Sequence, residues 1–96
     1  MKELTFTVID FETTGFSPET GDRAIEVAAI QIKSGKIVSQ YQSLIRTGEA
    51  IPYDIQRITG ITNDMTDSAP EAKTVMKKLA KFIGTSTVVA HNVSFD

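Results

Sequence analysis

The sequence contains no cysteine, and this absence excludes several kinds of site. Without cysteine there is no disulfide, no thiolate nucleophile and no zinc site with sulfur ligands. No apolar run is long enough to cross a membrane. An excess of one charge is also lacking, because 10 Lys and Arg stand against 12 Asp and Glu, for a net charge of −2. That balance argues against a protein held to nucleic acid by bulk positive charge, although it leaves room for an enzyme that contacts phosphates through metal ions.

The composition is typical of one small, soluble globular domain. The 96 residues are 41% hydrophobic and 23% charged, which is near the lower size limit for burying a good core. The first four residues are not a signal peptide, because they lack its apolar segment and its small-residue cleavage site. Together with the missing cysteines, this start favours a cytoplasmic protein. The sequence shows no internal repeat and no low-complexity segment.

Two carboxylates, Asp10 and Glu12, follow an apolar run from Leu4 to Ile9. Side chains alternate between the faces of a strand, so both carboxylates point the same way, about 7 Å apart at their roots. Like charges this close raise each other's pKa unless a cation neutralises them. A divalent cation, which prefers hard oxygen ligands, would suit the pair. The plain alternative is a solvated strand end that happens to carry two acids.

Four segments have patterns typical of β-strands. They are residues 4–10, 24–32, 36–46 and 87–90. The second is apolar on both faces, which predicts a central strand, whereas the third has a polar face, which predicts an edge strand. Ser34 and Gly35 between them predict a hairpin with a two-residue turn. The fourth segment is predicted to be short and buried.

The segment between the hairpin and the last strand is predicted to hold two helices. Pro52 suits the first turn of a short helix with Ile55 and Ile58 on one face and Gly60 as its end. Residues 61–67 are predicted to be a mostly polar linker.

A longer helix is expected to begin at a capping box formed by Ser68 and Glu71 and to run to about Ile83, with Gly84 as its C-terminal cap. Its apolar residues recur at helical spacing. They are Ala72, Val75, Met76, Leu79, Phe82 and Ile83. Met76, and Met65 before the helix, are predicted to pack inside the fold.

This order of elements predicts an α/β fold, with a mixed sheet and an early antiparallel hairpin. The helical crossover allows residues 87–90 to lie parallel beside residues 4–10. Asp96 would then emerge near the strand end that carries Asp10, where sites form in such sheets. Glu26 keeps two interpretations, a buried acid near this end or an exposed residue at a strand edge.

Residues 10–15 (DFETTG) resemble the first motif of the DEDD 3′–5′ exonucleases, the family of the proofreading epsilon subunit of bacterial DNA polymerase III. Residues 91–96 (HNVSFD) resemble the second motif, Asn-x-x-Phe-Asp. Residues 25–29 (IEVAA) and 58–62 (ITGIT) agree with the family in order and spacing. Thr59, where epsilon-type members often have His, is closer to exonuclease domains fused to Gram-positive polymerases and to some helicases.

The resemblance implies a ribonuclease H-like fold and two Mg²⁺ or Mn²⁺ ions, bound by the catalytic residues Asp10, Glu12 and Asp96. Such a pair of ions can orient a water and stabilise the leaving oxygen of an in-line displacement. The implied substrate is a nucleic acid 3′ end, with single-stranded DNA favoured. The residues expected to border the terminal nucleotide are Phe11, Thr13, Thr14, Ile61, Asn92 and Phe95.

The family's third motif, which supplies a His or Tyr and a fourth Asp, is not found in this sequence. The only histidine, His91, belongs to the second motif by position and is not the family's base. Residues 1–96 are therefore expected to be the N-terminal portion of a single exonuclease domain, with the last strand and helices of the fold absent. We expect a proofreading-type 3′–5′ exonuclease of DNA whose activity in this stretch alone is weak or nil.

Two other functions stay open. Asp10-x-Glu12-x-Thr14 also resembles the nucleophile loop of haloacid dehalogenase-like phosphatases, although these usually have a second Asp where Glu12 stands. The other alternative is a non-catalytic, exonuclease-like module that binds a polymerase or helicase. An incomplete sheet would also expose an unpaired edge and an apolar face, so self-association by edge pairing or domain swapping is expected.

Overall fold

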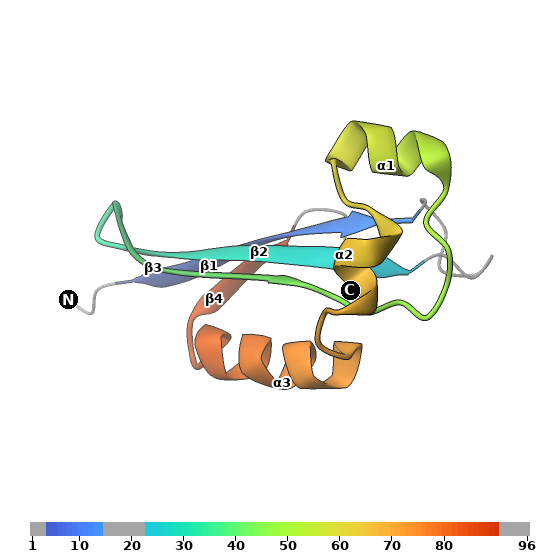
Figure 1. Ribbon diagram of the computed structural model, residues 1–96. Coiled ribbons are helices and arrows are strands. Elements are labelled where there is room, and N and C mark those ends of the chain that lie inside the picture. The colour runs from blue at the N-terminus through green and yellow to red at the C-terminus, as the bar shows by residue number, and fades with distance from the viewer. Residues whose placement is uncertain (1–3, 15–22, 91–96) are drawn as a thin grey trace.

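A four-stranded mixed sheet is the centre of the molecule (Figure 1). The computed structural model describes residues 4–14 and 23–90. The strand order is β3-β2-β1-β4, and the strands are β1 Thr5–Thr13, β2 Ala24–Lys33, β3 Lys36–Leu44 and β4 Thr87–Ala90. The β1–β2 and β2–β3 pairs are antiparallel, whereas β1 and β4 are parallel. The predicted α/β architecture, the central β2, the edge position of β3 and the parallel β4 are all confirmed.

The β2–β3 hairpin is closed by the two residues that the sequence indicated. Ser34 has a φ of 53° and Gly35 a φ of 77°, so both lie in the left-handed region. Two consecutive residues of this kind twist a turn in the same sense as its strands, and glycine adopts the conformation without a steric penalty. Lys33 pairs with Lys36 across the turn. The turn therefore sets the register of β3 on β2.

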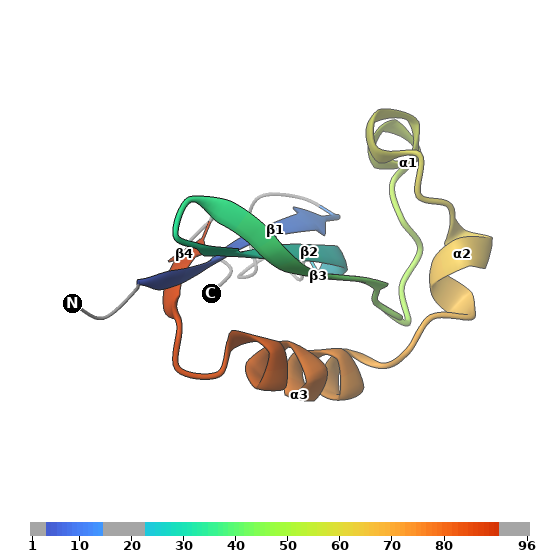
Figure 2. The same cartoon turned by 90° about the vertical axis from the view of Figure 1, so that its left-hand side faces the viewer.

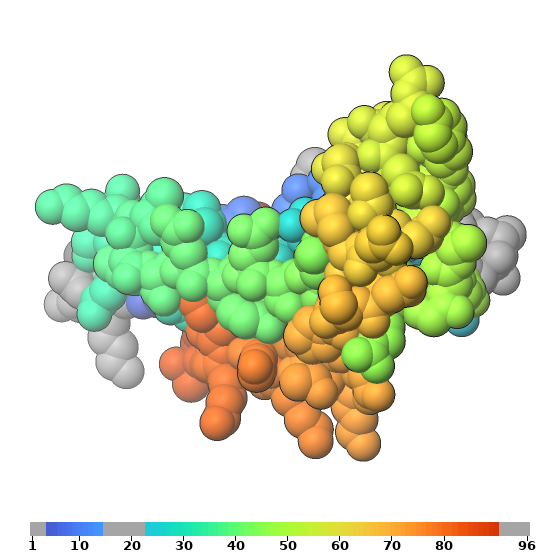
Figure 3. Space-filling view, viewed as in Figure 1, coloured from blue at the N-terminus to red at the C-terminus, as the bar shows by residue number. Residues whose placement is uncertain are grey.

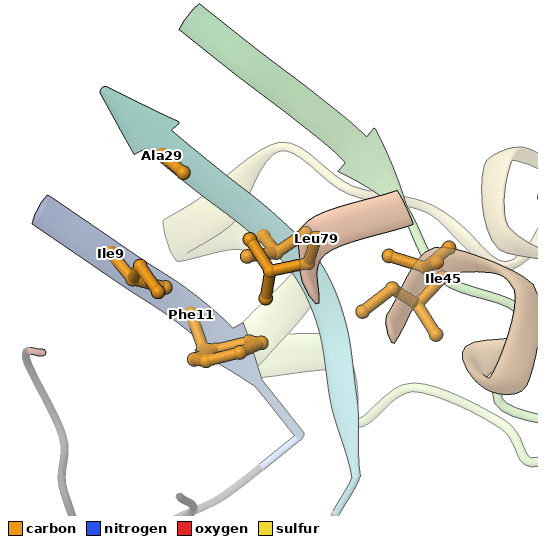
Figure 4. Packing of buried hydrophobic residues seen from close by; sticks show 7 residues of the cluster. Ile9, Phe11, Ala29, Ile45 and Leu79 are labelled. Atoms are coloured by element: carbon orange, nitrogen blue, oxygen red, sulfur yellow. The ribbon is translucent and has the colours of Figure 1, made fainter. Parts of the chain in front are cut away.

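Helix α3, Ala72–Ile83, covers one face of the sheet (Figures 1 and 2). Val75 and Leu79, from its predicted apolar stripe, are buried against side chains of β1 and β2. The buried cluster consists of Ile9, Phe11, Val27, Ala29, Ile45, Val75 and Leu79 (Figure 4). The main core thus lies between α3 and a single face of the sheet.

Helices α1, Tyr53–Thr59, and α2, Asn63–Asp67, form a unit that projects beside the sheet (Figure 2). A second buried cluster anchors this unit: Ile25, Ile51 and Ile61, with Leu44 and Ile55 packed against them. Gly60 ends α1, as predicted, and its φ of 77° makes it a left-handed cap. Among the helices of the described ranges, none has the length and apolar character needed to span a bilayer.

Helix α2 was not predicted, because residues 61–67 look like a polar linker. In the structure the Asn63 side-chain oxygen accepts a hydrogen bond from the Ile51 backbone N–H at 2.7 Å, and Thr66 is buried. The Thr66 N–H donates to the Thr62 carbonyl at 3.2 Å, which closes the helical turn. Contacts to a distant segment therefore stabilise a helix that is too short to form by its own propensity.

The predicted start of α3 is also wrong. The helix begins at Ala72, with Glu71 at the N-cap position and no side-chain capping bond, so Ser68 and Glu71 do not form a capping box. Ser68 is instead the C-cap residue of α2, and its hydroxyl donates to the carbonyl of Asp64 in that helix. The Arg46 N–H donates to the Pro70 carbonyl at 2.8 Å, and Arg46 bridges to Glu71 in parallel. This bridge keeps residues 70–71 extended.

Some residues predicted to be packed inside the fold are exposed. Strand β4 has its predicted bounds but is not buried, because it is the outer strand of the described sheet; Val88 is 46% and Val89 49% exposed. Ile58 is 79% exposed, and Met65 and Met76 lie at the surface as well.

Strand β3 ends at Leu44, two residues short of the predicted end. Figure 3 shows its side chains at the surface above α3.

We expect Leu79→Ala to lower the free energy of unfolding by about 2–4 kcal/mol, because it removes buried methyl groups and leaves a cavity under the sheet. Met76→Ala on the same helix is the matched control, since Met76 is 38% exposed, and it should cost less than about 1 kcal/mol. Urea denaturation followed by far-UV circular dichroism measures both changes. Equal losses for the two variants would contradict the core described above.

Candidate metal centre on the open face of the sheet

Strand β1 presents its two acids on the face opposite to the main core. Ile9 and Phe11 are buried toward α3, whereas Asp10 and Glu12 between and after them are exposed. The alternation confirms the prediction that both carboxylates point the same way. Strand β1 pairs with β2 along its whole length, including Asp10 and Glu12, and with β4 as far as Ile9, so the backbone ladders fix this orientation.

Strand β2 supplies the neighbours of both acids. Ala28 pairs with Asp10, and Glu26 pairs with Glu12, so these side chains share the open face. Paired residues in antiparallel strands have their Cβ atoms about 5 Å apart. Glu26 is half-buried, and its Oε2 accepts a hydrogen bond from Nε2 of Gln42 on β3 at 2.7 Å. The structure thus places a third carboxylate beside the predicted pair and a small residue beside Asp10.

A β-bulge follows Glu12 directly. The register runs from the pair Glu12–Glu26 to the pair Thr13–Ala24, so Ile25 has no partner on β1. Ile25 is fully buried in the second cluster, beside α1 and α2. Bulges increase the local twist of a strand and redirect side chains. Because of this bulge, Ile25 packs against the helical unit while the next residue, Glu26, lies opposite Glu12.

The electrostatics of this face are unfavourable without a cation. The pKa of Glu12 is raised above its ordinary 4.5, first by partial burial of its carboxyl and then by the negative charges of Asp10 and Glu26. Carboxylates that repel one another and offer hard oxygen donors fit Mg²⁺ or Mn²⁺. In residues 4–14 and 23–90, however, no three His, Cys, Asp or Glu side chains converge closely enough to hold a metal by themselves.

Asp96, the expected third ligand, lies outside the described residues, as do His91, Asn92 and Phe95. Strand β4 runs parallel to β1 and pairs Ala90 with Ile9, one residue before Asp10. The chain therefore leaves β4 next to the acidic pair. A meeting of Asp96 with Asp10 and Glu12 stays a prediction, and this direction of β4 is the observation in its favour.

The other predicted substrate residues have structural partners in the described part of the chain. Phe11 is 8% exposed in the main core, and Ile61 is 4% exposed in the second cluster, so both pack internally. The Thr14 N–H donates to the Arg23 carbonyl, and the Thr14 Oγ1 accepts from the Arg23 N–H, both at 2.8 Å. These two hydrogen bonds fix the end of β1 beside the start of β2. Thr13, half-buried, ends the strand.

A hollow of about 530 Å³ lies at the other end of β1. Leu4, Thr5 and Gln31 line it together with residues 82–87, and none of its lining residues is acidic. It does not contain the candidate metal ligands.

The sequence alone did not predict the hydrogen bond between Glu26 and Gln42. An acid within an otherwise apolar strand was a signal for Glu26. Gln42 could not be identified in the same way, because its position depends on the register of two strand pairs.

Residues 7–96 match the sequence model of a family described as exonuclease. The chain is 42% identical over 96 residues to a DNA polymerase III PolC-type of Bacillus cereus and 36% identical over 96 residues to the 3′-5′ exonuclease DinG of Bacillus subtilis. Both matches cover 100% of this chain, but only 7% of the first relative and 10% of the second. The chain thus spans a tenth or less of these curated relatives.

Solved structures of exonucleases have a fold similar to that of this chain. The structure titled Exonuclease X in complex with 5′ overhanging duplex DNA is 30% identical with a TM-score of 0.76, over 95% of this chain and 51% of that one. The nuclease domain of 3′hExo, a DEDDh family member bound to rAMP, is 24% identical with a TM-score of 0.76, over 92% of this chain and 50% of that one. The expected ribonuclease H-like fold is confirmed.

The raised pKa of Glu12 predicts a pH-dependent effect on stability. Between 4.5 and the raised value the folded state binds more protons than the unfolded state, so ionisation of Glu12 costs stability as the pH rises. In metal-free protein, Glu12→Gln should therefore raise the free energy of unfolding at pH 7 by roughly 0.5 kcal/mol, a modest effect for an exposed group. At pH 3.5 the gain should vanish.

Urea titrations at the two pH values in the presence of a chelator measure this difference. Glu49→Gln, in an exposed loop, is the matched removal of one carboxylate and should show no such gain at pH 7. A gain of the same size at pH 3.5 and at pH 7 would contradict the electrostatic explanation.

Proposed function

Because this chain belongs to the exonuclease family, we propose that it forms part of a metal-dependent 3′–5′ exonuclease that removes nucleotides from the 3′ end of DNA. The observation that carries the proposal is the exposed pair Asp10 and Glu12, on a central strand whose neighbour β4 runs toward the same end. The relatives support it, since one is named a 3′-5′ exonuclease and another a DNA polymerase III. A proofreading role, a single-stranded DNA substrate and a cytoplasmic location belong to the same proposal.

The proposed cofactors are two Mg²⁺ or Mn²⁺ ions, held by Asp10, Glu12 and Asp96. When bound, such ions supply an activated water and stabilise the oxygen that leaves the phosphodiester. The chain itself presents the oxygen ligands of Asp10 and Glu12 on a strand that is paired with β2 at both positions and with β4 up to Ile9, which limits their movement. Ala28 beside Asp10 is small and exposed, and it leaves lateral room on the sheet for ions and a phosphate.

The residues proposed to border the terminal nucleotide divide into two groups by their place in the fold. Phe11 and Ile61 are buried and would shape the site from within, by fixing β1 and the helical unit. Thr13 ends β1 directly after Glu12, and hydrogen bonds between the next residue, Thr14, and Arg23 hold this strand end in place. Asn92 and Phe95 are the remaining residues proposed to border the terminal nucleotide.

A polymerase or helicase is the proposed partner, because relatives of the first kind and DinG contain a matching segment within much longer proteins. The sequence includes no segment matching the third family motif, so we propose that a polypeptide of these 96 residues alone hydrolyses DNA weakly or not at all. A non-catalytic module would bind the same partners but would not need to bind metal. Metal binding therefore separates the two proposals.

In the natural protein that contains these residues, Asp10→Asn should reduce 3′–5′ hydrolysis by about a thousandfold, because losing a metal ligand removes several kcal/mol of transition-state stabilisation. The assay follows a 5′-labelled single-stranded oligonucleotide with Mn²⁺, in which wild-type protein should produce a ladder shortened from the 3′ end. Electron paramagnetic resonance of Mn²⁺ should show tight binding by wild type and weak binding by the variant.

Asp54→Asn, which removes an exposed acid from α1, is the control and should leave both readouts unchanged. Binding of Mn²⁺ without hydrolysis in the natural protein would favour the non-catalytic module. A protein that neither binds Mn²⁺ through Asp10 nor shortens the oligonucleotide would overturn the proposed function.

We also propose that a polypeptide of these 96 residues self-associates through β4. This strand is the outer one of the described sheet on its side, and Val88 and Val89 expose about half of their surface. An exposed apolar edge strand pairs readily with another copy, and a lysine at such an edge opposes pairing. Val88→Lys should therefore lower the weight-average mass in sedimentation equilibrium at tens of micromolar, whereas Ile58→Lys on exposed α1, away from the sheet edges, should not. A monomeric wild type would refute the proposal.

A further inference from the structure

We infer that Glu26, held by Gln42, is a positioning residue of the proposed metal centre: it increases the affinity of Asp10 and Glu12 for a divalent cation without being a ligand itself. The inference rests on the proposed function, because it concerns the same cations. It assigns a role to an acid that the sequence left between two interpretations.

The placement of Glu26 follows from strand register. Glu26 is directly opposite Glu12 on the open face, at a Cβ separation of about 5 Å, and diagonal to Asp10 at about 7–8 Å. These spacings leave Glu26 within Coulombic reach of a cation held by the pair. The small side chain of Ala28, opposite Asp10, leaves the space between the three acids unfilled by a bulky neighbour.

Gln42 holds the Glu26 carboxylate from the other side. In the register of β2 and β3, Gln42 pairs with Ala28 and Leu44 pairs with Glu26, so the Gln42 amide reaches diagonally to the next pair along the strand. Its Nε2 donates to the Glu26 Oε2 at 2.7 Å. Gln42 therefore restricts the position of this carboxylate beside the other two acids.

A purely structural role does not explain this arrangement. Like charges directly opposite each other in a sheet are destabilising, and the residues flanking Glu26 on β2, Ile25 and Val27, are fully buried apolar side chains. A neutral or apolar residue at position 26 would remove the repulsion. A cation on this face would offset the repulsion, and the Glu26 carboxylate would then strengthen the binding of that cation.

Groups around the ligands of a metal typically change its affinity by 10–100-fold. We expect Glu26→Gln to weaken Mn²⁺ binding by about tenfold and Gln42→Leu by a smaller factor, about threefold, because Gln42 acts through Glu26. The titration uses the natural protein with Mn²⁺ as the probe, followed by calorimetry at about 0.15 M salt, where charges beyond about 8 Å are largely screened. Glu49→Gln, which removes one negative charge from an exposed loop outside the sheet, should change the affinity less than twofold.

Stability without metal distinguishes a positioning role from a structural one. In metal-free protein Glu26→Gln should raise the melting temperature, because the repulsion is relieved, while it weakens Mn²⁺ binding. A structural role would lower both quantities. Glu26→Asp keeps the charge and should retain most of the affinity. If Glu26→Gln did not fold, Gln42→Leu on the exposed edge strand would carry the same test.

Each outcome decides between the inference and the proposed function. Weakening by Glu26→Gln beyond that of Glu49→Gln, with an unchanged or raised melting temperature, supports the inference. Binding that Asp10→Asn abolishes but Glu26→Gln leaves unchanged overturns the inference alone. Absence of Mn²⁺ binding by the wild type overturns the metal centre itself and the inference with it.

Discussion

The alternation of side chains along β1 is the constraint on which the rest of the structure depends. Ile9 and Phe11 must face α3, because they form the main core, and this requirement sends Asp10 and Glu12 to the opposite face. A register slip of one residue would exchange the two sets. It would bury two carboxylates and expose the core residues, at a cost of several kcal/mol per charge. The energy that stabilises the fold therefore also orients the acids.

The hairpin and the bulge extend this control to neighbouring strands. Ser34 and Gly35 fix the register of β3 on β2, and this register brings Gln42 to Glu26. The bulge after Glu12 turns Ile25 into the second cluster while Glu26 stays on the open face. A turn at one end of the sheet and a bulge at the other thus determine which polar groups surround the acidic pair, although neither contributes a ligand.

Local patterns in the sequence were sufficient to predict the elements that have a strong period. The alternation before Asp10, the Ser34–Gly35 turn and the apolar stripe of α3 each depend on residues close in sequence. The first two were confirmed, and the stripe was confirmed at Val75 and Leu79 but not at Ala72 and Met76, which are exposed. Helix α2 and the start of α3 were mispredicted because long-range hydrogen bonds decide them: Ile51 to Asn63, and Arg46 to Pro70.

The candidate site likewise has features that local patterns predict and features that depend on contacts between distant segments. Spacing alone indicated that Asp10 and Glu12 share a face, because strand geometry is a local property. Glu26 and Gln42 could not be assigned from spacing, since their contacts require the pairing of three strands. The exposure of β4 was also beyond local pattern, because Val88 and Val89 are apolar whether or not another element covers them. Burial is a property of the assembled sheet.

The second cluster suggests why the helical unit and the acids occur at the same end of the sheet. Ile61, which the family motif associates with the substrate, is buried against Ile25, and Ile25 directly precedes Glu26 on the bulged strand. A residue in a close-packed cluster transmits a change of volume to its neighbours, because interiors contain little free space. Ile61 can therefore influence the open face without touching a nucleotide, by fixing the position of the strand that carries Glu26. The packing of α1 and α2 would then support the geometry of the proposed metal centre, without a contribution from the exposed side chains of α1.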